Sequence, residues 1–329
     1  MLTAILSTRG FDASRARLCA SLFVEATLDG VYTHGLERFP RFVSYIGKGW
    51  VRPTAEPRLV VAAGALERWD GEYGPGNLNA LAMSDRAVEL ARVHGIGCVA
   101  LAHTNHWMRG GQYGLRMAEA RVAAICWTNT LPNLPAWGSR DSVLGNNPLV
   151  IALPRREGPV LLDMAMSQFS FGKLERAALR GEELPVEGGW DAQGRLTRDP
   201  AAILETRRAL QTGYWKGSGL SLVLDLLGVM LSGGDSVGAV GLHEAEYGLS
   251  QVFIAIDTAR LSSLDELIEA VEEMESRVHG AAPAEGFGSV RFPGESRLQT
   301  RVKNLERGLP LRPALWEEIV ALEKELSRP

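Results

Sequence analysis

The chain has 329 residues, of which 46% are hydrophobic and 22% charged, so it can bury a large core and is not disordered. Its net charge is −4, and no run of lysine or arginine exceeds two residues. A dedicated nucleic-acid-binding or membrane-surface protein is therefore excluded, because binding phosphates needs a basic footprint, whereas a small anionic substrate needs only one or two cations.

The chain opens with two predicted helices joined by a polar turn. Apolar residues recur on one face over residues 12–29, which predicts an amphipathic helix. The turn V-Y-T-H-G-L-E-R follows at 31–38, and a second helix is predicted over 40–47. The turn thus places His34 and Arg38 four residues apart between two helices.

From residue 58 the pattern changes to alternating strands and helices. We predict a strand pair over 58–70 and a helix over 77–95. Short apolar runs predict further strands at 98–102, 122–127, 149–154, 159–165 and 250–257. Helices are predicted at 167–181, 220–234, 264–275 and 315–326, and residues 180–200 form a polar surface excursion. This alternation indicates an α/β sheet that is covered on both faces.

The cysteines and the N-terminus carry no signal for metal binding or export. Cys19, Cys98 and Cys126 are far apart and show no ligand spacing, so we predict buried thiols, no disulfide framework and no metal site. The N-terminus lacks a basic region followed by an apolar core, and no stretch approaches the ~18 apolar residues of a membrane span. We expect a cytoplasmic protein with no membrane partner.

One stretch fits a dinucleotide-binding fingerprint by its letters alone. Gly95–Ala100 reads G-I-G-C-V-A, which matches G-x-G-x-x-A. It follows a predicted helix and precedes a strand, the reverse of the context that brings a pyrophosphate to a helix N-terminus. We therefore interpret it as a helix cap, and a nicotinamide enzyme with this sequence would need a non-Rossmann site.

Polar residues follow three of the predicted strands. The strand at 98–102 runs into H-T-N-H, that at 122–127 into T-N-T, and that at 159–165 contains Asp163. Ligands of open α/β sheets bind outside the carboxyl ends of strands, so these residues are site candidates. Ordinary turn formation by asparagine and aspartate is the alternative.

Four basic or titratable side chains are candidates for chemistry on an anion. His34 can give a proton near neutral pH, and Arg38 can hold a carboxylate through two hydrogen bonds. His106 and Arg109 lie in H-W-M-R-G-G, where two glycines allow close approach of a ligand. A solvent-exposed position is the alternative for each. The run 213–219, G-Y-W-K-G-S-G, is either a phosphate cradle at a helix start or a plain capped turn.

Six motifs together resemble the malate/L-lactate dehydrogenase-like oxidoreductases, whose members lack the Rossmann fold. They occur in the family's order over nearly the whole chain: T-H-G with R-F-P (33–40), N-H (105–106), G-N-N-P (145–148), D-M (163–164), G-K-L-E (172–175) and W-K-G-S-G (215–219). The runs N-H-W-M-R-G-G, I-C-W-T-N, G-Y-W-K-G-S-G and E-A-E-Y-G indicate a narrower group that acts on a 2,3-dioxo acid.

The resemblance implies a fold, a cofactor and an assembly. It implies a three-layer α/β/α domain with a mixed sheet, over residues 58–261, and a helical domain from 1–57 and about 262–329. It implies a homodimer with NADH bound near the subunit interface, NADPH being the alternative cofactor.

The resemblance also implies roles for individual residues. His34 matches the proton donor, and Asp163, if it lies near the imidazole, would orient His34 and raise its pKa. Arg38, His106 and Arg109 are the candidates for binding the substrate. The residues that match cofactor contacts are Pro159, Val160, Leu161, Leu162, Asp163, Met164, Ala165, Trp215, Lys216, Gly294, Glu295 and Ser296.

The activity implied is the reduction of a small 2-oxo or 2,3-dioxo carboxylate with NAD(P)H. Oxidoreductases of the same family that act on malate, lactate, sulfolactate or cyclic imino acids are alternatives, as is a non-catalytic nucleotide-binding homologue. The sequence departs from the family at Leu36-Glu37, where Val-Asn is usual, and the position of the acidic residue in Gly294–Ser296 is shifted. Glu37 adds a negative charge beside a site that is expected to hold an anion.

Overall fold

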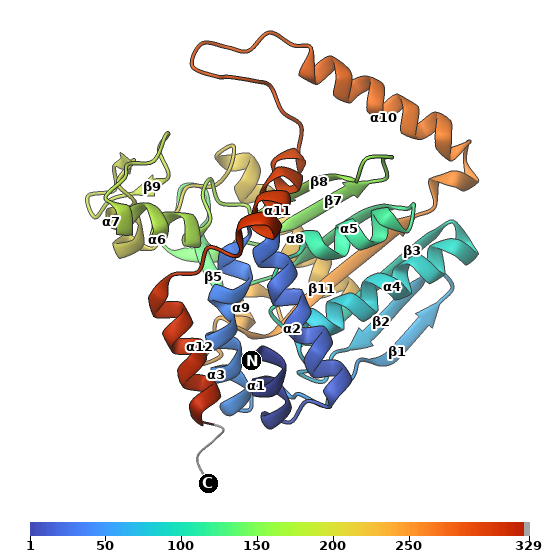
Figure 1. Ribbon diagram of the computed structural model, residues 1–329, viewed down its shortest axis with the longest axis horizontal. Helices are drawn as coiled ribbons and strands as arrows, with labels where there is room; N and C mark the ends of the chain where they lie inside the picture. Colours follow the sequence, from blue (N-terminus) through green and yellow to red (C-terminus); the bar gives the residue numbers. More distant parts are fainter. Residues whose placement is uncertain (326–329) are drawn as a thin grey trace.

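A seven-stranded mixed sheet lies at the centre of the protein, with the strand order β1-β2-β3-β11-β4-β7-β8. The computed structural model describes residues 1–325 (Figure 1). The strands are β1 (Arg58–Ala63), β2 (Leu66–Asp70), β3 (Ile96–Asn105), β4 (Ala123–Thr128), β7 (Leu149–Leu153), β8 (Val160–Met164) and β11 (Tyr247–Ile256). β2 and β3 pair in parallel, and the other neighbouring pairs are antiparallel. The predicted mixed, non-Rossmann sheet is confirmed.

Three strands end at one edge of this sheet. β3 and β4 both pair antiparallel with β11, so they run in the same direction. β7 is antiparallel to β4, and β8 is antiparallel to β7, so β8 shares that direction. The polar residues that follow β3, β4 and β8 therefore lie along a common edge, as the strand-end argument requires.

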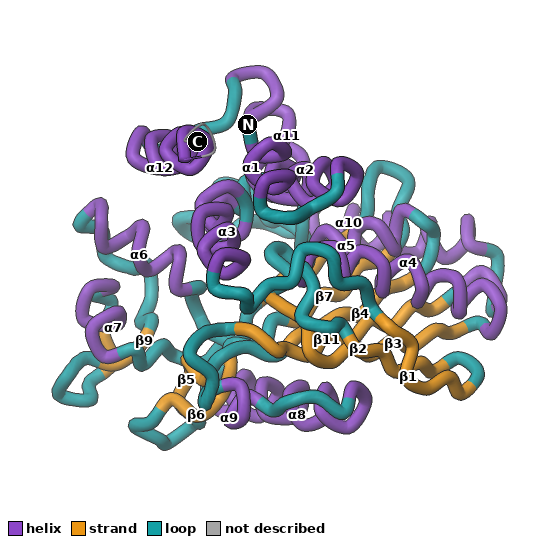
Figure 2. Tube along the Cα trace, turned by 90° about the horizontal axis from the view of Figure 1, so that it is seen from below, coloured by secondary structure: helices purple, strands orange, loops and turns teal. Residues whose placement is uncertain are grey.

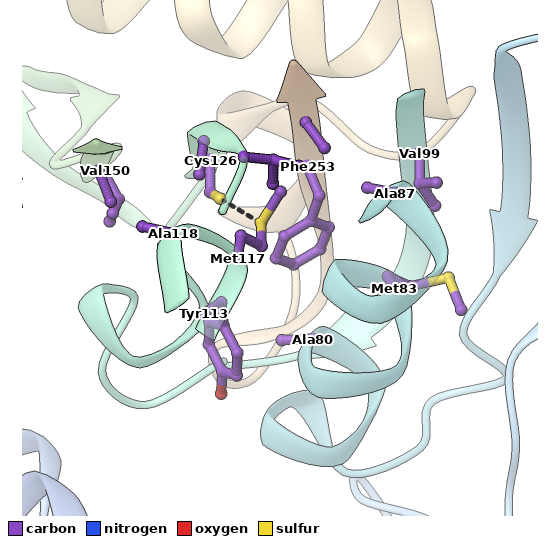
Figure 3. Packing of buried hydrophobic residues seen from close by; sticks show 14 of the residues in the cluster. Ala80, Met83, Ala87, Val99, Tyr113, Met117, Ala118, Cys126, Val150 and Phe253 are labelled. Carbon is purple, nitrogen blue, oxygen red and sulfur yellow. Dashed lines mark hydrogen bonds between the residues drawn. The ribbon is translucent and has the colours of Figure 1, made fainter. Parts of the chain in front are cut away.

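Helices cover both faces of the sheet (Figure 2). α4 (Gly76–His94) and α5 (Gly111–Glu119) lie on one side, and α8 (Trp215–Ser232) and α9 (Val237–Val240) on the other. Between α4, α5 and the sheet is an apolar core that includes Tyr113, Met117 and Phe253 (Figure 3). The Tyr113 ring meets that of Phe253 edge-on at 6.1 Å. This packing holds the start of α5 against the sheet.

Helices from both ends of the chain share a second apolar cluster. They are α1 (Leu2–Thr8), α2 (Ala13–Leu28), α3 (Phe39–Gly47) and α12 (Pro313–Glu325). Phe23 and Phe39 pack edge-to-face at 5.3 Å, and Leu315 and Ile319 of α12 are buried in the same cluster. A helical region made from both chain ends, which the resemblance implied, is confirmed. α10 (Leu264–His279) and α11 (Glu295–Arg307) connect the sheet to α12.

The predicted helices and strands are confirmed with shifts of a few residues at their ends. The segment predicted helical at 167–181 is α6 (Phe171–Arg180), and Gly95 caps α4 in a left-handed conformation, so the dinucleotide fingerprint was rightly set aside. α5 was not predicted. Residues 326–329, to which the last predicted helix extends, lie outside the described residues. The smaller elements are β5 (Pro132–Pro135), β6 (Ser142–Gly145), β9 (Gly189–Trp190), β10 (Leu196–Thr197), α7 (Pro200–Thr206), and the short 3-10 helices η1 (Tyr32–His34), η2 (Leu36–Arg38) and η3 (Thr258–Arg260).

The prediction of buried thiols is confirmed for two of the three cysteines. Cys19 and Cys126 are buried, and Cys98 is half-buried. Burial raises the pKa of the Cys98 thiol to about 11, so it is protonated at neutral pH. Among residues 1–325, no helix has both the length and the apolar character that crossing a bilayer would need.

Candidate active site

A cavity of about 1710 Å³ opens at the edge where β3, β4 and β8 end. Its wall includes residues from η1, the loop before α5, β8 and α11. Pockets for one small ligand usually measure about 300–1,000 Å³. This cavity therefore has room for a dinucleotide and a small substrate together.

His34 enters the cavity from the turn between α2 and α3. The turn is held by Thr27, whose hydroxyl oxygen accepts a hydrogen bond from the Leu36 amide at 2.8 Å. A side chain at Gly35 would collide with this Thr27 hydroxyl, so the close approach requires glycine. His34 Nδ1 lies 3.1 Å from Thr33 Oγ1. The half-buried imidazole is thus fixed through the hydroxyl of the residue before it.

His106 lies parallel to His34. The two ring centroids are 5.6 Å apart, with an angle of 20° between the planes. His106 Nδ1 accepts a hydrogen bond of 2.9 Å from the Met108 amide, so the neutral ring carries its proton on Nε2. Two cationic rings in this arrangement would repel each other. Protonation of His106 at Nδ1 would also break its hydrogen bond from the Met108 amide. His106 therefore stays neutral with an Nε2–H group to donate, and His34 is the ring that can take up a proton.

Burial and nearby charges keep both imidazoles neutral. Burial, together with the guanidinium groups of Arg38 and Arg109, lowers the pKa of His34 to about 4. Burial, Arg38 and His34 lower the pKa of His106 well below its usual value. The expectation that Asp163 raises the pKa of His34 is wrong, because the positive charges and the burial act in the opposite direction.

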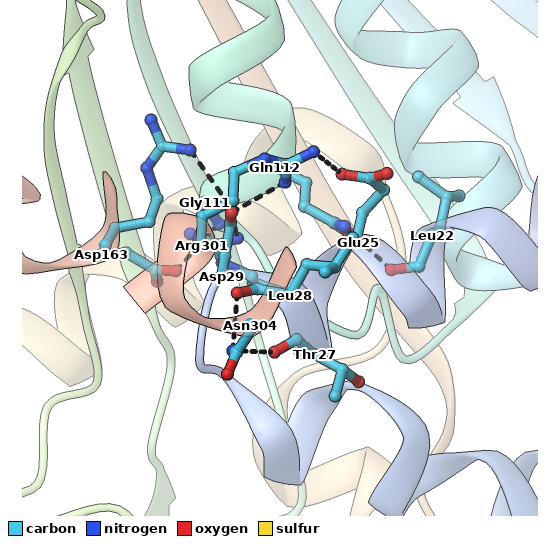
Figure 4. Close-up of polar contacts among 12 residues, drawn as sticks. Leu22, Glu25, Thr27, Leu28, Asp29, Gly111, Gln112, Asp163, Arg301 and Asn304 are labelled. Atoms are coloured by element: carbon cyan, nitrogen blue, oxygen red, sulfur yellow. Dashed lines mark hydrogen bonds and ion pairs between the residues drawn. The ribbon is translucent and has the colours of Figure 1, made fainter. Parts of the chain in front are cut away.

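Asp163 lines the same cavity but has different partners. Its Oδ2 accepts a hydrogen bond of 3.0 Å from the Gly111 amide, at the start of α5 (Figure 4). Burial raises the pKa of the Asp163 carboxyl, while Arg109 and the Gly111 amide oppose that shift. The His34 ring contacts Thr33 and His106 instead, so Asp163 does not orient it.

Arg38 is held by the carboxylate of Glu246, the residue before β11, at the sheet edge where β3 ends. Its Nη2 donates to Glu246 Oε2 at 2.7 Å, and both side chains are mostly buried. Glu37, whose charge the sequence left unexplained, pairs with Arg176 at 3.1 Å and lies 3.7 Å from Arg312. Glu37 therefore links the turn to α6 and to the segment before α12.

Arg109 is buried against Asp29, the residue that ends α2. Its exposed fraction is 3%, and its Nη1 is paired with Asp29 Oδ2. Asp29 also binds Arg297 at 3.2 Å and Arg301 at 2.9 Å; Figure 4 shows Arg301 beside it. Three guanidinium groups around one carboxylate keep its pKa low despite burial. This cluster joins α2, α11 and the loop before α5 beneath the cavity.

Two of the three segments predicted to contact the cofactor lie side by side. Gly294, at φ 93°, would place a Cβ within 3.1 Å of the Leu161 backbone, and the Leu161 amide donates to Pro293 O at 3.2 Å. Leu161, Asp163 and Ala165 line the cavity, as alternate residues of one strand do, whereas Val160, Leu162 and Met164 lie on the other face. Ser296 lines the cavity, and Glu295 is turned away and pairs with His279 at 3.1 Å.

The third predicted segment lies elsewhere. Trp215 and Lys216 form the first turn of α8, on the opposite face of the sheet from α4 and α5. Trp215 is 63% exposed, and neither residue lines the cavity. The predicted helix start at 220 was too late, since Gly217–Gly219 is already helical.

The cavity wall carries more positive than negative charge. Four of its cations form no ion pair among residues 1–325: Arg41, Arg207, Lys303 and Arg307. Ser296 and the start of α11 lie on the same wall. Such a donor set fits the phosphates and carboxylate of a dinucleotide and an anionic substrate.

The sequence pattern of the family described as malate/L-lactate dehydrogenase matches residues 1–320. The chain belongs to this family of nicotinamide-dependent dehydrogenases. The family resemblance drawn from the six motifs is thereby confirmed.

Individual members of the family agree with this assignment. A 2,3-diketo-L-gulonate reductase of Citrobacter koseri is 44% identical over 320 residues, which are 97% of this chain and 96% of that protein. The solved sulfolactate dehydrogenase from Methanocaldococcus jannaschii superposes with a TM-score of 0.90 at 27% identity, over 99% of this chain and 94% of that one. The solved Δ1-piperideine-2-carboxylate reductase from Pseudomonas syringae superposes with a TM-score of 0.84 at 27% identity, over 98% of this chain and 96% of that one.

Several residues around the cavity were not found from the sequence. Asp29 had been read only as the end of a helix, and Arg297, Arg301 and Glu246 had no assigned role. The spacing of Arg297 and Arg301 places both on one face of α11, which is a usable signal. Nothing in the local sequence pairs Glu246 with Arg38, because the contact depends on the order of strands in the sheet.

Proposed function

We propose that the protein reduces a small 2-oxo or 2,3-dioxo carboxylate with NADH, and that its substrate is 2,3-diketo-L-gulonate, giving 3-dehydro-L-gulonate. The observation that carries this proposal is the convergence of His34, His106 and Arg38 in a cavity large enough for a dinucleotide. The names of relatives at 42–44% identity over 97% of the chain support the choice of substrate.

In this mechanism the chain's own residues bind the anion and supply the proton. Arg38 holds the substrate carboxylate through guanidinium donors that Glu246 leaves free, and Arg109 adds positive charge from beneath. When bound, NADH supplies the hydride that adds to the carbonyl carbon. His34 gives its proton to the oxygen, so the product is an alcohol. His106 donates a hydrogen bond from its Nε2–H to the neighbouring oxo group and keeps its proton.

Binding of the substrate also prepares His34 for this role. The free imidazole is neutral at pH 7 because it is buried beside Arg38 and Arg109. A carboxylate on Arg38 cancels part of that positive charge and favours the imidazolium. Asp163 contributes through Arg109 and the Gly111 amide rather than through His34.

The cofactor is proposed to lie along β8 and the start of α11. Leu161, Asp163, Ala165, Gly294 and Ser296 would hold it on that wall. Lys303 and Arg307, which form no ion pair within the described part of the chain, stand on the same side and fit its phosphates. We propose NADH as the preferred nucleotide, with NADPH to be compared directly.

We further propose that the protein is a homodimer that buries the exposed face of α8. The apolar side chains on this face are 38–75% exposed: Trp215, Leu220, Leu222, Val223, Leu226, Leu227 and Met230. They recur at helical spacing, and a monomer rarely exposes such a stripe. The dimer gives Trp215 and Lys216, which do not reach the cavity of their own chain, a position in the interface.

A cofactor-by-substrate matrix tests the proposed function. NADH and NADPH are each combined with 2,3-diketo-L-gulonate, pyruvate, oxaloacetate, sulfopyruvate and a cyclic imino acid, and loss of absorbance is followed. We expect the highest kcat/KM with NADH and 2,3-diketo-L-gulonate. A higher kcat/KM for another acid reassigns the substrate within the family, and NADH binding with no turnover on any of them contradicts the enzyme assignment.

A further inference from the structure

The run E-A-E-Y-G at 244–248 marks the narrower group to which this sequence is similar, but none of its residues binds the substrate or transfers a proton in the proposed mechanism. Glu246 lies just before β11 and lines the cavity. Its carboxylate is 2.7 Å from Arg38 Nη2, although 208 positions separate the two residues in the chain. The motif therefore reaches the substrate-binding arginine.

The contact leaves most of the Arg38 guanidinium free. Glu246 accepts through one oxygen from one nitrogen, and a guanidinium has five N–H donors in a planar fork. The exposed fractions of the two side chains are 17% and 12%, so the pair is mostly withdrawn from water. When a hydrogen bond fixes one side of a guanidinium group, the remaining N–H donors can bind a carboxylate in a fixed direction.

Aromatic packing fixes the backbone next to Glu246. The ring of Tyr247 stacks on Trp50 at 5.7 Å with an interplanar angle of 12°, and on His243 at 4.6 Å with an angle of 22°. The Tyr247 carbonyl oxygen lies 3.0 Å from His243 Nδ1. The tyrosine of the motif thus anchors the strand end from which Glu246 projects.

We propose that Glu246 is a positioning residue, which holds the Arg38 guanidinium so that its free donors face the substrate carboxylate. The neighbouring Glu37 does not do this, because it is bound to Arg176 and Arg312. The proposal rests on the proposed function, since it assigns Arg38 to the substrate.

A second consequence concerns the charge near His34. The charged and titratable groups that bear on the two imidazoles are Arg38, Arg109, Arg41 and the rings themselves, and Glu246 offsets Arg38. Replacing Glu246 by glutamine keeps a hydrogen-bond acceptor but removes the negative charge. Arg38 then disfavours the imidazolium more strongly, so the pH profile of reduction shifts to lower pH.

The test separates geometry from charge with two variants and one control. Binding of oxamate, an unreactive analogue of a 2-oxo acid, is measured by calorimetry on the full chain with and without NADH. Glu246→Ala loses both the acceptor and the charge, and we expect oxamate to bind about tenfold or more weakly, the size of a lost charged hydrogen bond. Glu246→Gln keeps the geometry and is expected to bind within about threefold of the wild type. Glu244→Ala, two residues earlier and exposed, is the control.

The outcomes are distinct. Wild-type affinity in Glu246→Ala, or an equal loss in Glu244→Ala, overturns the proposal, and so does an unshifted pH profile in Glu246→Gln. If the wild type reduces no oxo acid but the oxamate pattern holds, the proposed function fails and the positioning role stands. Thermal melts of the variants confirm that each is folded when it is measured.

Discussion

The imidazole of His34 is neutral in the free protein at pH 7, although we assign it as the proton donor of the reaction. In the free protein its pKa is lowered to about 4, by burial first and then by Arg38 and Arg109. Ring stacking on His106, whose Nδ1 accepts from the Met108 amide, leaves His34 as the ring that can titrate. The residue that gives the proton is thus protonated mainly when an anion is bound beside it.

This arrangement predicts the pH dependence of reduction. Because the free-enzyme pKa lies below neutral, the protonated fraction falls tenfold per pH unit above about pH 5, and kcat/KM for the oxo acid should fall with it. Stopped-flow absorbance of NADH from pH 5 to 8 measures the slope. A plateau that extends to about pH 6.5, the ordinary histidine value, contradicts the account.

Stability limits the acid side of that measurement. A histidine whose folded pKa lies below its unfolded value of about 6.5 takes up its proton in the unfolded state first, so stability is lost as pH falls from there towards 4. Circular dichroism at each pH defines the range in which the slope is interpretable.

At the scale of elements, the site is made where unrelated parts of the chain meet. The ends of β3, β4 and β8 form one edge, η1 brings His34 to it, and α11 closes it through the Asp29 cluster. The strand-end argument predicted which segments contribute. It could not predict the ion pairs between them, such as Arg38 with Glu246, because these depend on which strands are neighbours.

Two wrong or missing predictions, helix α5 and the partner of Asp163, also depend on contacts between distant parts of the chain. α5 begins with two glycines and follows W-M-R, so its start has no cap signal, and its packing on Phe253 makes it helical. Asp163 was placed near His34 because both matched catalytic motifs. Its strand directs it to the Gly111 amide instead. Six short motifs predicted the family and several of the residues that line the cavity. The hydrogen bonds and ion pairs between those residues were found only in the structure.

The contact of α11 with β8 gives a prediction at this scale. Gly294→Ala would force a side chain into a left-handed conformation and against the Leu161 backbone, so we expect a loss of more than about 1 kcal/mol in unfolding free energy and weaker NADH binding. Urea denaturation and fluorescence titration with NADH measure the two effects.

Gly286→Ala is the matched control for this change. Gly286 also has a positive φ, 85°, but no atom lies within 4 Å of the added carbon. It should lose some stability and keep its affinity for NADH. Equal NADH affinity in Gly294→Ala and the wild type would remove α11 from the cofactor site.

At the scale of the whole molecule, two regions of the chain contribute residues to the cavity. We propose that residues 58–261 form the unit that carries the sheet, and that residues 1–57 with those from about 262 form the helical unit. The cavity draws on both, since His34 belongs to the first helices and Asp163 to β8.

The proposed dimer makes a prediction at this scale. Met230 is 75% exposed on α8, so Met230→Glu should leave the fold intact but bury an unpaired charge in the interface. We expect a monomer in sedimentation equilibrium, against a dimeric wild type. Val93→Glu, at a 67% exposed apolar position on α4 across the sheet, should stay dimeric. A dimeric Met230→Glu, or a monomeric wild type, contradicts the proposed interface.

The most direct test of the central claim compares the wild type with His34→Asn on 2,3-diketo-L-gulonate. NADH oxidation and NADH affinity are measured on the same preparations. General acid catalysis of this kind contributes about 10²–10⁴-fold, so kcat should fall by that factor while the Kd for NADH stays the same. Turnover of the variant at the wild-type rate would contradict the assignment of His34 as the proton donor.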